Sequence, residues 1–464
     1  MTARKIFGVL SGIAFGGLLV PQAAQALPAF AAQTGQTCTA CHIGGFGPQL
    51  TPLGRAFKIG GYTQTGGDGL RAKIPLSAMA LGSFTNTASA VPADQVATGY
   101  RANNNLNLDQ ASLFIAGNIG DHSGAMMQIT GGNNFAAWKL DNSDIRPFTT
   151  AFDVGDKELR IGFTLNNNPT VQDPYNSTYA WGYPYVAPGL APTPAGQTML
   201  AGALSTNSIG YTGYLWWDKS LYLEAGVYQT QSPWLLKAGG NDFSIGSTAG
   251  AAPYLRAAYE WNWGDNSAHA GALFMQSNVS PVSGVRQTDP SFGHDTYTDT
   301  SLDAGYQYLG NGTHIFTVDA IYTHEQQALN GSAAAFNAAN ATSFGSKYSL
   351  DQFRINGSYW YNNTYGLTLN YQRVWGSANP VLYAPGEFTG SAASRPGTDA
   401  YVVEVDWVPF GKDDSWAAPL ANLKLGVQYI GYVRYNGGTA AYDGVTGRSA
   451  SNNNTVYAFA WLAF

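Results

Sequence analysis

Apolar and polar residues alternate with a period of two in many stretches from Pro75 to the end of the chain. In residues 158–165 the odd positions carry Leu, Ile, Phe and Leu, and the even positions carry Glu, Arg, Gly and Thr. Residues 220–229, 401–407 and 423–429 repeat this pattern. Such alternation is typical of strands with one apolar face. We therefore expect successive strands throughout this region.

The segments between these strands are alternately short and long, which is typical of an outer-membrane barrel with short periplasmic turns and long external loops. The pattern predicts about 16 strands, an even number that places both ends of the barrel on the periplasmic side. Short turns are expected at 120–124, 155–157, 217–220, 264–267, 310–312 and 362–366, with a longer one at 410–420. Long connections are expected near 87–105, 132–145, 167–206, 231–252, 280–298, 327–349, 377–398 and 436–453.

Composition supports a barrel. Only 11% of the residues are charged, and the mean hydropathy is −0.14. The chain is thus too uncharged for an ordinary soluble enzyme and too polar for a helical membrane protein. The net charge of −6 comes without a basic run that would indicate nucleic acid. The fold predicted is all-β: a transmembrane antiparallel β-barrel over residues 75–464, preceded by a small N-terminal module.

Two further patterns belong to a barrel. The C-terminal residues 456–464 alternate and end in Phe464, as expected of a closing strand that the barrel insertion machinery recognises. Aromatic residues cluster near strand ends, and we interpret them as an interfacial girdle. They are Trp216, Trp217, Trp261, Trp263, Trp407 and residues 359–361.

The first 26 residues have the features of a secretory signal peptide. Arg4 and Lys5 precede an apolar core at 6–20, and Ala24 and Ala26 form a small-x-small cleavage site. An uncleaved anchor is the alternative, but the core is short for a membrane span and contains four glycines. The exported chain is therefore expected to begin after Ala26.

The candidate chemistry lies in Cys38, Cys41 and His42, which form a C-x-x-C-H motif. This is the attachment signature of a c-type haem, in which two thiols bind the haem vinyl groups and the His binds iron. These are the only two Cys in the chain. A redox C-x-x-C, a local disulfide and a partial zinc site are the alternatives, but neither a βαβ context nor a second zinc-ligand pair is nearby. We therefore predict one covalent haem c, with His42 as the proximal iron ligand.

Residues 27–74 form the expected haem module, which would plug the barrel. A short helix is predicted over 51–58, with a Thr cap and a Pro in the first turn. Arg55 and Lys58 are candidates to pair with the haem propionates, as are Arg71 and Lys73, although all of them can equally be solvated charges. A module this small has little core of its own, so it must pack against the haem and the barrel.

The chain resembles the fused outer-membrane monohaem cytochrome–porins of iron-oxidising bacteria. The N-terminal residues carry most of the resemblance, and Ala32 departs from it because a basic residue is expected there. The matching segments are 28–31, 33–35, the C-x-x-C-H motif, 54–58, 60–63 and the loop segment 166–185. The resemblance implies a one-electron oxidoreductase in the outer membrane. It would oxidise extracellular ferrous iron and pass the electron to a periplasmic carrier.

The second iron ligand is less clearly indicated. Met79 is the first choice because it follows the module most closely. His122 and His269, near periplasmic turns, are alternatives, and so is an open or water-bound site. The long loop 167–206 is expected either to constrict the pore or to approach the haem, unless it is an ordinary external loop.

Two functions follow from these patterns. The first is electron transfer from an external donor, most simply ferrous iron, which Asp289 and Asp295 near the outer mouth would attract. The alternative is an outer-membrane diffusion porin for small solutes, in which haem is structural or sensory. The two differ in whether the haem is redox-active and whether the channel conducts.

Overall fold

The computed structural model describes most of the chain after the expected signal peptide. The segment 1–26, residue Asp289 and the loop residues 177–186 lie outside the described part. The described residues are 27–96, 98–132, 137–176, 187–201, 204, 206–241, 247–280, 290–340, 343–412, 415–418 and 420–464.

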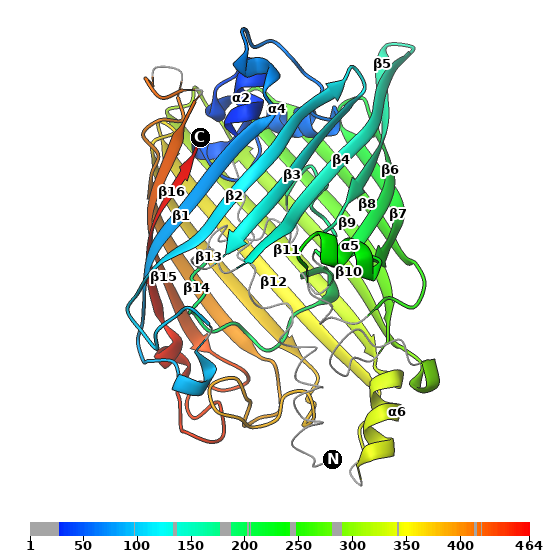
Figure 1. Ribbon diagram of the computed structural model, residues 1–464, viewed down its shortest axis with the longest axis vertical. Coiled ribbons are helices and arrows are strands. Elements are labelled where there is room, and N and C mark those ends of the chain that lie inside the picture. The colour runs from blue at the N-terminus through cyan, green and yellow to red at the C-terminus, as the bar shows by residue number, and fades with distance from the viewer. Residues whose placement is uncertain are drawn as a thin grey trace.

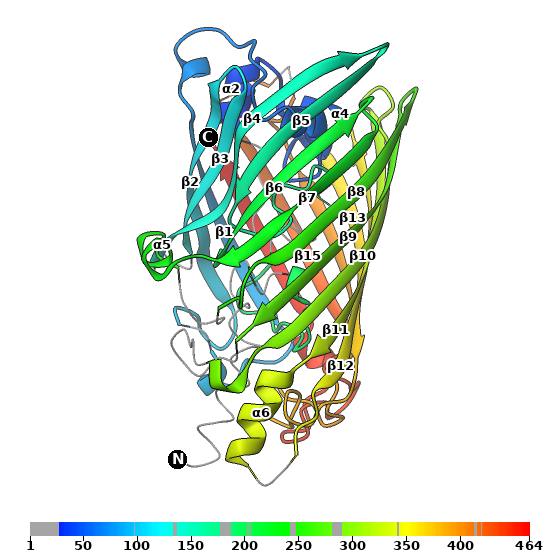
Figure 2. The same cartoon turned by 90° about the vertical axis from the view of Figure 1, so that its right-hand side faces the viewer.

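Sixteen antiparallel strands form a closed barrel within these residues. Each strand pairs with its neighbours in the sequence, and the first strand pairs with the last to close the wall. Figures 1 and 2 show the tilted strands around one lumen. The predicted fold class and strand number are confirmed. The first eight strands are β1 Leu76–Thr87, β2 Asn105–Gly120, β3 Ser123–Gly132, β4 Ala137–Val154, β5 Lys157–Asn166, β6 Ser208–Trp217, β7 Leu221–Thr230 and β8 Ala252–Trp263. The other eight are β9 Asn266–Val279, β10 Asp295–Tyr308, β11 His314–Ala328, β12 Lys347–Tyr361, β13 Tyr365–Gly376, β14 Thr398–Trp407, β15 Asn422–Arg434 and β16 Thr455–Ala463.

The predicted turns and loops agree with the strand ends except at one place. Residues 132–145 were expected to be a long connection, but β4 begins at Ala137 and pairs with β3. The pairing shifts register between Met127 and Ile129, and residues 141–144 are buried in succession. A bulge of this kind interrupts the period-two pattern, so the strand has no clear signal in the sequence.

The helices are short. The module contains α2 Pro28–Thr34, α3 Cys38–Cys41 and α4 Pro52–Ile59, and the loops carry α5 Pro233–Ala238 and α6 Asn330–Ala339. The 3-10 turns are η1 Ile43–Gly45, η2 Arg71–Lys73, η3 Ala93–Gln95, η5 Met199–Ala201, η6 Pro290–Phe292 and η7 Ala450–Asn453. Helix α4 begins as predicted, because the Thr51 hydroxyl accepts a hydrogen bond from the Gly54 N–H and Pro52 occupies the first turn. No helix among the described residues is both long and apolar enough to span a bilayer.

The barrel wall is apolar outside and largely polar inside, the reverse of a soluble protein. On β8, Leu255 is 52% exposed on the outer face, whereas Arg256 and Glu260 are buried on the inner face. Some of the predicted girdle follows the same rule, since Trp261 and Trp407 are exposed. An outer band of this kind matches the hydrocarbon interior of a bilayer.

Two residues assigned to the girdle face inward instead. Trp216 and Trp360 are buried, and a Cβ added to Gly44 of the module would lie 2.4 Å from the Trp360 ring. The interpretation as girdle is therefore wrong at these two positions. Period-two alternation cannot distinguish an aromatic residue that faces lipid from one that faces a folded plug.

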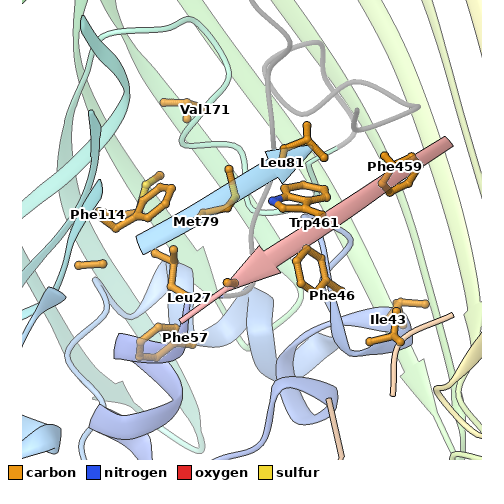
Figure 3. Close-up of a cluster of buried hydrophobic side chains, with 14 of the residues drawn as sticks. Leu27, Ile43, Phe46, Phe57, Met79, Leu81, Phe114, Val171, Phe459 and Trp461 are labelled. Carbon is orange, nitrogen blue, oxygen red and sulfur yellow. The ribbon is translucent and has the colours of Figure 1, made fainter. Parts of the chain in front are cut away.

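The module lies inside the barrel at the end where the short turns are, which Figure 1 shows beside the C-terminus. Its apolar side chains join one cluster with the inner face of β1 and β16. The Phe46 ring lies 4.8 Å from the Trp461 ring, and Figure 3 shows Trp461 next to both Phe46 and Leu81. Residues 27–74 therefore pack against the barrel, and their apolar core is largely the barrel wall.

Candidate functional site

Helix α3 presents both thiols from a single turn. Thr37 before it and His42 after it are extended, so the helix is confined to the Cys pair. Cys38 is buried and Cys41 is half-buried, and both are free thiols. The alternative of a local disulfide is therefore not what the structure contains. Among the described residues, no group of three or more His, Cys, Asp or Glu side chains is arranged to hold a metal ion.

The two Cys and His42 line a cavity of about 830 Å³, counted to its open mouth. The walls are mainly apolar, which suits a macrocycle more than a polar ligand. Besides Cys38, Cys41 and His42, the lining residues are Leu27, Phe30, Ala31, Thr34, Gln36, Thr37, Pro48, Leu50, Gly54, Phe57, Lys58, Tyr62, Met126 and Asn176.

Burial sets the charge of the motif. It lowers the pKa of His42 to about 4, although the nearby Gly47 backbone partly favours the charged form. Burial also raises the pKa of the Cys38 and Cys41 thiols to about 11. Within the described residues, the buried Nδ1 of His42 makes no hydrogen bond of normal geometry. The site thus holds a neutral imidazole, which is the form that binds iron, and two protonated thiols at its edge.

Arg55, predicted to contact a propionate, is directed at the barrel wall. Its guanidinium makes a bidentate ion pair with Glu260 at 3.0 and 2.9 Å, and donates to the Ser267 hydroxyl at 2.7 Å. It does not line the cavity. The observed role of Arg55 is to fasten α4 to β8 and β9.

Lys58 lines the cavity but is already engaged. Its ammonium donates to the carbonyl oxygens of Val171 and Asp173 and to the side chain of Asn176, at 2.8 to 2.9 Å. Burial lowers its pKa to about 8. Lys73 is exposed and does not line the cavity. A propionate contact stays a prediction, and among the described side chains of the predicted set Lys58 lies on the cavity wall.

The structure separates the candidates for the second ligand. Met79 is buried against the module but does not line the cavity, nor do His122 and His269. His269 lies 3.5 Å from Asp303 and stacks on another ring of the lumen. Met126 on β3 does line the cavity. Sequence reasoning missed it because the order of residues does not show which strand the module touches.

The described parts of loop 167–206 fold into the lumen. Residues 167–175 are buried, and Asp173 accepts a hydrogen bond from Arg256 at 3.2 Å. Asn176 reaches the cavity wall. The segment 187–201 crosses the lumen, where the Leu200 N–H donates to Asp299 at 2.8 Å and the Tyr432 hydroxyl to a Pro192 carbonyl at 2.8 Å. These residues therefore fold inward instead of forming an ordinary external loop, and constriction of the pore or approach to a haem stays a prediction.

Comparison with protein-family models finds no match, and comparison with curated proteins finds none either. Solved structures of outer-membrane proteins are similar at low identity. Outer-membrane expressed OmpT of Vibrio cholerae has 12% identity over 84% of this chain and 97% of that chain, with a TM-score of 0.39. The DcaP channel of Acinetobacter baumannii has 12% identity over 84% and 96%, with a TM-score of 0.41. Salmonella typhi OmpF in complex with daunomycin has 9% identity over 84% and 97%, with a TM-score of 0.41. These scores lie below 0.5, and the barrel architecture of this chain rests on its own strand pairing.

Proposed function

We propose that this chain is an outer-membrane electron-transfer protein that carries one haem c on Cys38 and Cys41, with His42 as the proximal iron ligand. The observation that carries the proposal is the convergence of all three residues on one apolar cavity. Haem c, when bound, supplies a single iron centre that gains and loses one electron. The chain's own residues hold it, exclude water with Phe30 and Phe57, and keep the imidazole neutral.

The exposed apolar band and the closed wall support an outer-membrane location. Short turns are periplasmic in such barrels, so the module would lie at the periplasmic end. An electron that crosses the membrane would then enter through the lumen from the long-loop end. It would leave to a soluble periplasmic carrier near α3.

Ferrous iron is proposed as the donor on the strength of the family resemblance. Asp295 gives little support as an attracting charge, because it is buried and accepts a hydrogen bond from the Ser332 N–H at 2.9 Å. A periplasmic carrier is proposed as the acceptor, because the module would lie at the periplasmic end of the barrel.

The test is the haem spectrum of the purified protein while ferrous iron is added without oxygen. Prompt reduction is expected, and His42→Ala should abolish it. A haem that dithionite reduces but ferrous iron does not would retain electron transfer and remove iron as donor. Absence of covalent haem would contradict the proposal as a whole.

A diffusion porin with a structural or sensory haem is the second candidate. A barrel of sixteen strands is wide enough for an aqueous channel, and its inner face is largely polar. On this alternative, purified protein would conduct small solutes, and Cys38→Ser with Cys41→Ser would leave conductance unchanged. The electron-transfer proposal expects little conductance from the intact chain.

A further inference from the structure

Strand β3 presents a thioether to the cavity. Side chains at every second position of a strand face the same side, so Met126 faces the same side of β3 as Gln128 and Thr130. Both of those residues are buried on the lumen side. The neighbouring Met127 faces the other side of the strand and is only half-buried. Two adjacent methionines thus point to opposite faces of the wall, and it is Met126 that lines the cavity with His42.

Close contact between β3 and the module explains why Met126 reaches the cavity. A Cβ added to Gly124 would lie 2.3 Å from the Gly61 carbonyl oxygen and 3.0 Å from the Tyr62 Cβ. Only a residue without a side chain permits this approach. Met126 is the next inward residue on the strand, so the contact sets its position relative to the motif.

Three polar groups on the cavity wall already have hydrogen-bond partners. The Tyr62 hydroxyl donates to Asp144 at 2.6 Å, and the Thr34 hydroxyl donates to a backbone carbonyl at 2.7 Å. The Lys58 ammonium has the three acceptors described above. The Met126 sulfur is a soft donor that a polar network does not compete for, and thioethers bind haem iron in c-type cytochromes.

We propose that the Met126 sulfur would bind the haem iron as its second protein ligand, in addition to His42. The inference rests on the proposed haem and goes beyond it by naming the group that completes the coordination. A Met ligand opposite His raises the reduction potential. Wild-type protein would therefore hold a six-coordinate haem that is closed to added ligands.

The test compares Met126→Leu with Met79→Leu and Met127→Leu in the full-length protein. Wild type should show the weak far-red charge-transfer band of a methionine–ferric haem bond, and the ferrous form should bind carbon monoxide slowly. Met126→Leu should lose the band, become high-spin and bind carbon monoxide rapidly, while keeping covalent haem on a denaturing gel. Met126→His should restore a low-spin haem with a lower potential. Met79→Leu and Met127→Leu should behave as wild type.

Each outcome separates the two proposals. If Met126→Leu keeps the band, or if Met79→Leu loses it, Met126 is not the ligand while the haem proposal stands. If wild type has covalent haem but no such band, and Met126→Leu leaves its spin state unchanged, the ligand proposal is overturned alone. If wild type has no covalent haem, both fall.

Discussion

At the scale of single residues, burial of His42 should make the stability of the haem-free protein depend on pH. The pKa of His42 falls from the ordinary 6.5 to about 4, so the unfolded chain takes up the proton first as the pH is lowered. The stability that the neutral ring contributes is complete above about pH 6.5 and is lost as the pH falls through the window down to about 4. Thermal unfolding of the haem-free protein across this window should show the loss. His42→Asn should remove that part of the pH dependence, and an identical profile in both proteins would contradict the expectation.

The ion pair between Arg55 and Glu260 is also a single-residue feature, because both side chains are 3% exposed. Arg55→Met leaves the Glu260 carboxylate buried without its partner, which costs about 3–5 kcal/mol in comparable pairs. In the haem-free protein, Cys38 should then become accessible to an alkylating reagent at a lower denaturant concentration. Lys157→Met is the matched control, because its pair with Asp218 is over 40% exposed on both sides and should matter little. Equal behaviour of the two variants would show that Arg55 does not hold the module.

A functional residue can be predicted from the sequence when the residues that define its role are close to it along the chain. Cys38, Cys41 and His42 were visible because five consecutive positions carry the whole motif. Met126 was not, because its role depends on which strand touches the module. Arg55 was visible as a cation, but its partner is 205 positions away in the sequence.

At the scale of elements, β3 is the strand against which the module sits. Gly124→Ala would place a methyl group 2.3 Å from the Gly61 carbonyl oxygen, so the module must move away from the wall. We expect faster alkylation of Cys38 in the haem-free protein and easier proteolysis within 27–74. Gly132→Ala on the same strand is the control, since a Cβ there meets nothing within 4 Å. If both variants match wild type, the contact between β3 and the module does not fix its position.

The period-two pattern predicted most of the strands. A barrel wall separates lipid from the lumen, and the side chains of almost every strand face these two environments in turn. The pattern failed where the environment inside is not water. Residues 141–144 are buried in succession, and Trp360 packs on the module. The plug makes part of the lumen resemble a protein core, and the sequence pattern has no means to signal that.

At the scale of the whole molecule, the barrel closes without any contribution from the module in its lumen. Closure of the barrel uses the pairing of β1 with β16, from Met79 with Ala463 to Thr87 with Thr455, and needs no residue of the module. Deletion of 27–74 should therefore leave an intact barrel with a several-fold higher conductance in planar bilayers. Some block should remain, because the segment 187–201 still crosses the lumen. If the intact chain conducts as well as the deletion variant, the module does not close the pore.

The position of the module has a consequence for biogenesis. The Thr39 N–H donates to the Gly411 carbonyl oxygen at 3.3 Å, so α3 is held against the turn between β14 and β15, which belong to the last part of the wall. An enzyme that joins a cofactor to thiols needs an extended, accessible motif. On the proposed function, haem attachment therefore precedes barrel closure, and export, maturation and insertion must occur in that order.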